Sequence, residues 1–212
     1  MKKIMGSNAR IDEEKLNVYS HALGIAFAIL GSLILIYFTL NSAKLPGVLI
    51  YCFSLILLFS ASTLYHAALT PNRKENLRKL DHISIYYLIA GTYTPVCLLV
   101  LHSSKGIPLL YIVWGIALLG TLLKLKFTGK FETLSLLLYA VMGWIIVIDI
   151  KEFLALATIE EVVLLSLGGF FYTFGIVFYA LKRIPYNHFI WHLFVLGGAT
   201  SHWVMIYLII NR

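Results

Sequence analysis

The sequence predicts an all-α integral membrane protein, a bundle of seven transmembrane helices with its N-terminus in the cytoplasm and its C-terminus outside. Composition is the first reason, because 60% of the 212 residues are hydrophobic and only 13% are charged. The second is that seven segments approach the roughly 20 apolar residues that a helix needs to cross a hydrocarbon core of about 30 Å. The third is an uneven distribution of Lys and Arg along the chain.

The seven predicted spans follow one another with short connections. In chain order they cover residues 22–40, 46–69, 83–101, 107–123, 133–150, 162–181 and 189–210. The basic stretch RKENLRK separates the second span from the third, KLKFTGKFE separates the fourth from the fifth, and KRIPYN separates the sixth from the seventh. Because these connections leave no room for a soluble domain, we expect residues 22–212 to form one helical domain.

Residues 1–21, MKKIMGSNARIDEEKLNVYSH, are predicted to form a cytoplasmic N-terminal segment. They lack the apolar core and the small-residue cleavage site of a secretory signal peptide, so we expect the segment to be retained. Asp12, Glu13 and Glu14 suit the first turn of a short helix at the membrane interface, because the positive end of the helix dipole favours acidic side chains. A frayed tail is the alternative.

The basic residues decide the predicted orientation, because cytoplasmic loops collect positive charge. With the N-terminus inside, the inner segments hold 13 of the 17 basic residues: Lys2, Lys3, Arg10, Lys15, Arg73, Lys74, Arg78, Lys79, Lys124, Lys126, Lys130, Lys182 and Arg183. The outer side keeps Lys44, Lys105, Lys151 and Arg212. The formal net charge of +7 therefore reflects topology and contact with anionic membrane lipids rather than nucleic-acid binding.

This topology brings polar side chains of three spans to one depth near the cytoplasm. His66, in SASTLYH, lies near the inner end of the second span, and Asp81, in RKLDH, stands at the start of the third. His188 and His192 lie in the first turns of the seventh span and share one helix face, because they are four residues apart. Ser62 stands in the same relation to His66.

Three imidazoles on facing helices are a known way to bind zinc, with a fourth position left for water in a catalytic site. Copper, iron and nickel also accept histidine ligands, so zinc is the preferred metal among several. For any single histidine, a bond to a neighbouring backbone group is the simpler explanation. For the set we favour a shared metal, because polar groups at membrane depth are costly unless they are partnered.

The remaining histidines are interpreted differently. His202 lies ten residues beyond His192, roughly 15 Å further along the helix, so we expect it to be a hydrogen-bonded packing residue in the outer half. His21, at the mouth of the first span, is read as an interfacial residue, with a supporting role behind the metal ligands as the alternative. His82 follows Asp81 and points about 100° away from it, which favours a lipid-headgroup or loop contact.

The stretches SASTLYH, KLDHISIYYLIAGTYTP and HFIWHLFVLGGATSHW, in this order, closely resemble the bacterial hemolysin III family, which is related to the progestin and adiponectin receptors. The resemblance covers nearly the whole chain and implies a seven-helix fold in the bacterial cell membrane. It also implies a zinc ion near the cytoplasmic face. Carried over to this sequence, the ligands are His66, His188 and His192, Asp81 contacts a metal-bound water, and Ser62 lies nearby.

Two functions follow from these expectations. In the first, the protein hydrolyses a lipid amide or ester: the metal activates water, and Asp81 accepts the proton. The resemblance supports this reading, because the related receptors are thought to resemble ceramidases. In the second, the metal is structural, Asp81 is a fourth ligand that closes the site, and the protein acts in membrane homeostasis, sensing or pore-forming cytolysis without chemistry of its own.

Overall fold

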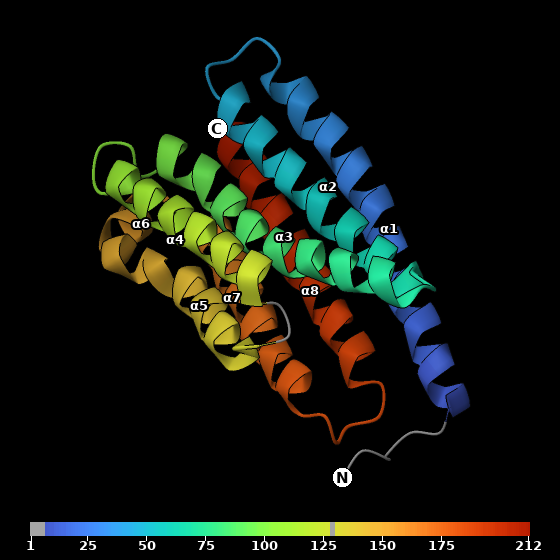
Figure 1. Ribbon diagram of the computed structural model, residues 1–212. Coiled ribbons are helices and arrows are strands. Elements are labelled where there is room, and N and C mark those ends of the chain that lie inside the picture. Colours follow the sequence, from blue (N-terminus) through green and yellow to red (C-terminus); the bar gives the residue numbers. More distant parts are fainter. Residues whose placement is uncertain (1–6, 128–129) are drawn as a thin grey trace.

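The computed structural model describes residues 7–127 and 130–212, and the described chain is helical apart from its short connections (Figure 1). In chain order the elements are α1 (Ser7–Thr39), α2 (Leu45–Ala67), α3 (Pro71–Leu99), α4 (Gly106–Phe127), α5 (Glu132–Trp144), the 3₁₀ helix η1 (Ile145–Asp149), α6 (Ile150–Leu156), α7 (Ile159–Ala180) and α8 (Asn187–Ile210). Among the described residues, seven helical stretches are long and apolar enough to cross a membrane, with α5, η1 and α6 forming one of them, Glu132–Leu156. This confirms the prediction of an all-helical, seven-span membrane protein.

Two spans begin earlier than the sequence predicted. The 33 residues of α1 give a helix about 50 Å long, well beyond the roughly 30 Å of a hydrocarbon core. The stretch expected to be either a separate interfacial helix or a frayed tail is therefore continuous with the first span from Ser7 onward, while residues 1–6 lie outside the described residues. Helix α3 begins at Pro71, so Asp81 lies within the helix rather than at its start.

The starts of several helices follow from local sequence. Pro71 occupies the first turn of α3, where its missing N–H is not needed and its fixed φ suits a helix. At α7, Thr158 and Glu161 form a capping box, in which each side chain accepts a hydrogen bond from the other residue's backbone N–H. Before α8, Tyr186 has a φ of 56°, so the chain turns sharply and places His188 in the first helical turn.

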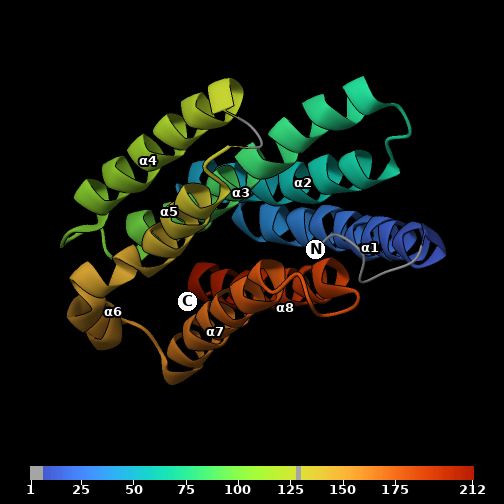
Figure 2. The ribbon, with the colours of Figure 1, turned by 60° about the horizontal axis from the view of Figure 1, so that its bottom comes forward.

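The helices form a ring of neighbours. Helix α2 packs between α1 and α3, α4 packs on α3, and α5 contacts α3, α4 and α7. Helix α8 packs against α7 and α1 and closes the ring (Figure 2). Helix α3 is the most buried span, whereas most of α7 lies on the outside. Residues from α2, α3, α5, α7 and α8 therefore face a common interior.

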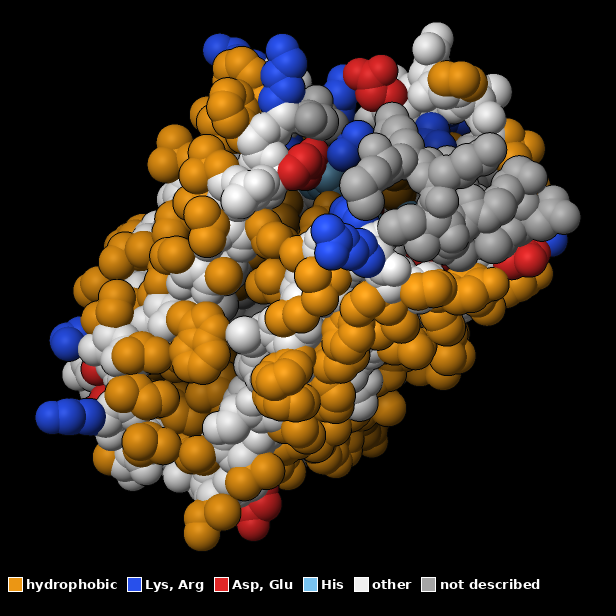
Figure 3. Space-filling model, turned by 90° about the horizontal axis from the view of Figure 1, so that it is seen from below, with side chains coloured by type: hydrophobic (Ala, Val, Ile, Leu, Met, Phe, Trp, Pro, Cys, Tyr) orange, Lys and Arg blue, Asp and Glu red, His pale blue; other side chains and the backbone are white. Residues whose placement is uncertain are grey.

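The surface separates charged ends from an apolar middle. In the view from below, Lys, Arg, Asp and Glu side chains gather at the ends of the molecule, and hydrophobic side chains cover most of the face between them (Figure 3). Large apolar side chains such as Leu119, Leu137 and Phe170 are exposed along α4, α5 and α7. Exposure of such a surface to water is unfavourable, whereas contact with lipid tails is not. The fold is therefore that of a multi-pass membrane protein.

Candidate metal centre

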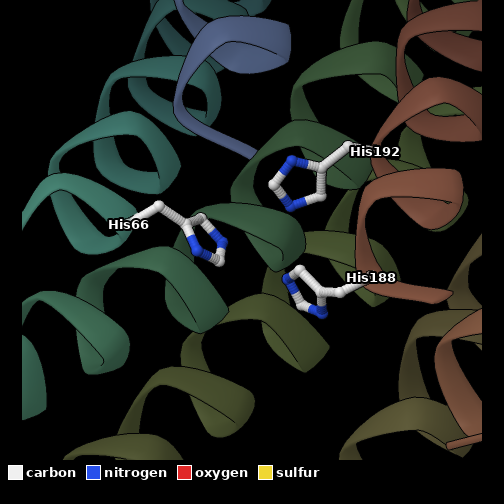
Figure 4. A group of neighbouring side chains, drawn as sticks. All are labelled: His66, His188 and His192. Atoms are coloured by element: carbon white, nitrogen blue, oxygen red, sulfur yellow. The ribbon is translucent and has the colours of Figure 1, made fainter. Parts of the chain in front are cut away.

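Three histidines meet at one end of the bundle, which is called here the histidine end. His66 comes from the last turn of α2, and His188 and His192 come from the first turns of α8. Their ring centroids are 5.0 Å apart for His66 and His188, 5.0 Å for His66 and His192, and 4.8 Å for His188 and His192. The three rings converge on a common space (Figure 4).

The geometry of this cluster suits a metal ion. One ring nitrogen from each histidine lies within 4.8 Å of the other two, and among the described residues this is the group of possible ligands that lies close enough together. Tetrahedral zinc with Zn–N bonds of about 2.0–2.1 Å requires nitrogens about 3.3 Å apart, so a bound ion would draw the three rings closer together. The Nε2 atom of His66 is buried without a hydrogen-bond partner, and a metal would satisfy it.

Asp81 and Ser62 lie beside this cluster. Both side chains are buried, and both line the same cavity as His188 and His192. The Ser62 hydroxyl interacts with the Asp81 carboxylate. The structure thus brings together the four residues that the sequence placed at one depth, and Ser62 one turn from His66, although they come from three helices.

Helix α1 contributes neighbours of the cluster, of which the sequence had offered only His21, as the alternative to an interfacial residue. The His21 ring stacks on His192 with centroids 3.7 Å apart and is 3% exposed, so it is not the interfacial residue that was expected. The Oε2 atom of Glu14 lies 2.7 Å from Nδ1 of His66, and the Ser20 hydroxyl lies 3.2 Å from Nδ1 of His192. The available signal was helical spacing, since Glu14, Asn17 and His21 share one face of a continuous helix.

His202 and His82 lie apart from the cluster. The Nε2 atom of His202 is 3.4 Å from the carbonyl oxygen of Leu165 on α7, which agrees with its expected role as a packing residue. The lipid-headgroup contact expected for His82 is wrong, because this residue is 7% exposed. Its Nδ1 atom lies 3.7 Å from Oε2 of Glu132, because α5 covers this side of α3.

A long apolar cavity opens from the cluster into the bundle. It is lined by Asp81 and His188 near the histidine end and by Val96 and Met205 towards the opposite end. Asp81 and Val96 are about 22 Å apart along the axis of α3. The cavity holds about 1430 Å³ of empty space, including the part that is open to the outside. Trp144 on α5 also lines it and is 55% exposed, so the cavity wall reaches the lipid-facing surface.

These features define the class: a multi-pass α-helical membrane protein with a buried three-histidine cluster that could hold a metal ion. Residues 9–203 match the family described as "Haemolysin-III related". The chain is 40% identical over 194 residues to the "Hemolysin-3 homolog" of Bacillus subtilis (strain 168), which covers 90% of this chain and 91% of that protein. It is 38% identical over 193 residues to "Hemolysin-3" of Bacillus cereus, which covers 90% of this chain and 88% of that protein.

The chain therefore belongs to the Haemolysin-III related family, which confirms the resemblance found in its motifs. A more distant relative is the human "Monocyte to macrophage differentiation factor", 29% identical over 208 residues that cover 94% of this chain and 85% of that protein. That protein is a member of the progestin and adiponectin receptor family, so the predicted relation to these receptors is confirmed as well.

Proposed function

We propose that this protein is a zinc-dependent hydrolase of a lipid amide or ester. The observation that carries the proposal is the cavity, because a single apolar space contains His188, His192 and Asp81 at one end and extends about 22 Å along α3. An acyl chain suits the apolar part, and a scissile carbonyl would then lie beside the polar end. Membrane lipids are therefore the proposed substrates and partners.

We propose that the histidine end faces the cytoplasm of a bacterial cell. The segments that the sequence assigns to the inner side carry 13 of the 17 Lys and Arg residues, and cytoplasmic loops are enriched in these residues. In this orientation the metal centre lies near the inner membrane surface, where water has access. The acyl part of the cavity lies deeper, and its wall at Trp144 meets the lipid.

Each site residue has a distinct proposed role. His66, His188 and His192 hold the ion, and zinc, when bound, polarises a carbonyl and lowers the pKa of water. Asp81 accepts a proton from the attacking water and returns it to the leaving group, and Ser62 orients the Asp81 carboxylate. The apolar cavity wall fixes the acyl chain, so that the carbonyl meets the water in one orientation.

The alternative is a structural metal in a non-enzymatic protein. Asp81 lines the same cavity as His188 and His192, and as a fourth ligand it would leave no open position on the metal. Two relatives carry the name hemolysin, and cytolysis, membrane sensing or homeostasis would then be the function. The two readings differ in what the Asp81 carboxylate does, and this residue therefore separates them.

The test compares wild type with Asp81→Asn, which keeps the size of the side chain and removes its basicity. Proton transfer by a positioned group contributes about 100-fold to 10,000-fold in rate, so we expect turnover to fall by that factor while zinc is retained. Purified protein is assayed by mass spectrometry against ceramides, acyl amides and phospholipid esters. Asp12→Asn is the matched control, because Asp12 is exposed and pairs only loosely with Lys15, at 3.9 Å.

Two outcomes would overturn the hydrolase reading. Absence of metal-dependent turnover in wild type on the whole lipid panel, together with full cellular function of Asp81→Asn, removes the catalytic role. Loss of zinc from Asp81→Asn makes Asp81 a direct ligand and favours the closed, structural site. Comparison of lipid extracts from cells with and without the protein adds substrates that the purified panel omits.

A further inference from the structure

One segment of α1, residues 13–21, contacts all three histidines of the cluster. The Nδ1 atom of His66 lies 2.7 Å from Oε2 of Glu14, and Nδ1 of His192 lies 3.2 Å from the Ser20 hydroxyl. The backbone N–H of His188 donates to Oε1 of Glu13 at 3.2 Å. The proposed ligands come from α2 and α8, so α1 is a third helix that contacts them.

The contact with Glu14 determines which nitrogen of His66 can bind a metal. An ionised carboxylate only accepts hydrogen bonds, so in the neutral His66 ring Nδ1 carries the hydrogen and Nε2 keeps its lone pair. Nε2 is the buried atom that lacks a partner in the protein. The amide nitrogen of Asn17 is also near Nδ1, but at 3.5 Å, and as a donor it cannot accept that hydrogen.

The same reasoning applies to His192. The Ser20 hydroxyl has one hydrogen, and it donates this to the carbonyl oxygen of Asn17 at 3.0 Å. Towards His192 it therefore acts as the acceptor, so Nδ1 of that ring carries the hydrogen and Nε2 is left for a metal. Two rings on different helices are thus set in the same tautomer by one segment.

Glu14 is itself held in position. Its other carboxylate oxygen, Oε1, accepts a hydrogen bond from Nζ of Lys74 on α3 at 2.9 Å. One carboxylate therefore connects α1, α2 and α3 at the histidine end. The His66 side chain is 3% exposed, whereas that of Glu14 is 41% exposed, so the pair runs from the protein surface to the buried ligand.

We propose that Glu14 is a positioning residue of the metal centre, which orients His66 so that its Nε2 faces the ion, and that Ser20 does the same for His192. This inference rests on the proposed metal site but not on hydrolysis. Carboxylate and hydroxyl partners behind histidine ligands fix the ring and raise its basicity, and their loss typically lowers metal affinity by about 10-fold to 100-fold.

The test measures zinc affinity in purified, full-length, metal-stripped protein by competition with a chromophoric chelator. Glu14→Ala should bind zinc about 10-fold to 100-fold more weakly than wild type. Glu14→Gln should lose less, because the amide oxygen still accepts the hydrogen of Nδ1. Glu75→Ala is the matched control and should leave affinity unchanged, since Glu75 is 69% exposed and contacts Lys79 on its own helix.

A thermodynamic cycle separates positioning from general stabilisation of the fold. If Glu14 acts through His66, Glu14→Ala should cause no additional loss of affinity in a protein that already carries His66→Ala. Lys74→Ala, which removes the other contact of Glu14, should weaken zinc binding less than Glu14→Ala does. X-ray absorption of the zinc-loaded Glu14→Ala protein should still report three imidazole ligands.

The outcomes are distinguishable. If wild type binds zinc and folded Glu14→Ala binds it equally tightly, the inference about Glu14 is wrong while the metal site stands. An affinity loss in Glu14→Ala as large as that of His66→Ala, with a carboxylate seen in the wild-type coordination sphere, would make Glu14 a ligand and also refute the positioning role. If wild type binds no metal, the proposed metal centre fails, and the inference fails with it.

Discussion

The close approach of α2 and α3 can be tested at Gly91, because this contact sets the spacing between the helices that carry His66 and Asp81. A Cβ atom added at Gly91 would lie 2.7 Å from Cβ of Ser54 and still closer to its Oγ. Ordinary carbon contacts are about 3.5–4.0 Å, so the helices would have to separate by about 1 Å. Rotation of Ser54 cannot relieve the clash, because its Cβ is fixed to the backbone of α2.

The expected magnitude is the difference between two effects. Replacing a helical glycine by alanine stabilises by about 0.5–1 kcal/mol, whereas overpacking costs about 1–3 kcal/mol. We therefore expect Gly91→Ala to lower the free energy of unfolding by up to about 2.5 kcal/mol. Gly115→Ala is the matched control on α4, where an added Cβ meets no atom within 4 Å, and it should be stabilising.

The assay is reversible unfolding in mixed micelles, with both variants measured against wild type. Ser54→Gly removes the atom that clashes, so the double variant with Gly91→Ala should be more stable than the sum of the two single effects predicts. Equal stability of the Gly91→Ala and Gly115→Ala proteins, or additive effects of Gly91→Ala and Ser54→Gly, would refute the close α2–α3 contact.

Two further predictions concern topology and metal. A reporter fused to the C-terminus should be active only outside the cytoplasm, because the segments that the sequence assigns to the inner side hold 13 of the 17 basic residues; activity inside the cell would invert the orientation. Elemental analysis should give about one zinc per chain, because the three histidines are the ligand set of a single catalytic-type zinc ion. The zinc content should drop in the alanine variants of the three cluster histidines and persist in His202→Ala; equal loss in His202→Ala would disprove the ligand assignment. The cluster histidines are His66, His188 and His192.

Much of the fold follows from the sequence, because hydropathy and helical geometry are local properties. Apolar segments of sufficient length identify the seven spans, and alternation of their direction brings the ends of the second, third and seventh to one side. His188 and His192 share a face through their four-residue spacing alone. These steps placed Asp81 and the three histidines together without knowledge of the packing.

The parts that were missed depend on how helices meet. Hydropathy marks the hydrocarbon part of a helix and not its end, so the polar turns of α1 and α3 were not recognised as helical extensions. The contact between Glu14 and His66 joins residues 52 positions apart, and the one between Ser20 and His192 joins residues 172 apart. His82 was assigned to the surface because the position of α5 over α3 is not encoded in α3 itself.

The length of α1 and the position of the proposed metal centre have the same physical cause, the cost of polar groups inside a bilayer. Polar ligands and their carboxylate partners are expensive at the centre of a bilayer, but their cost falls near the interface. The histidines lie in terminal turns of α2 and α8, and α1 is about 50 Å long against a hydrocarbon core of about 30 Å, so its first turns can surround them there. The apolar cavity then extends from this polar end towards Val96, into the depth where lipid tails lie. The proposed substrate, a lipid with a polar head and an acyl chain, would match this gradient along its whole length. A site at the centre of the bilayer would instead have to bury the polar head, at the greatest cost.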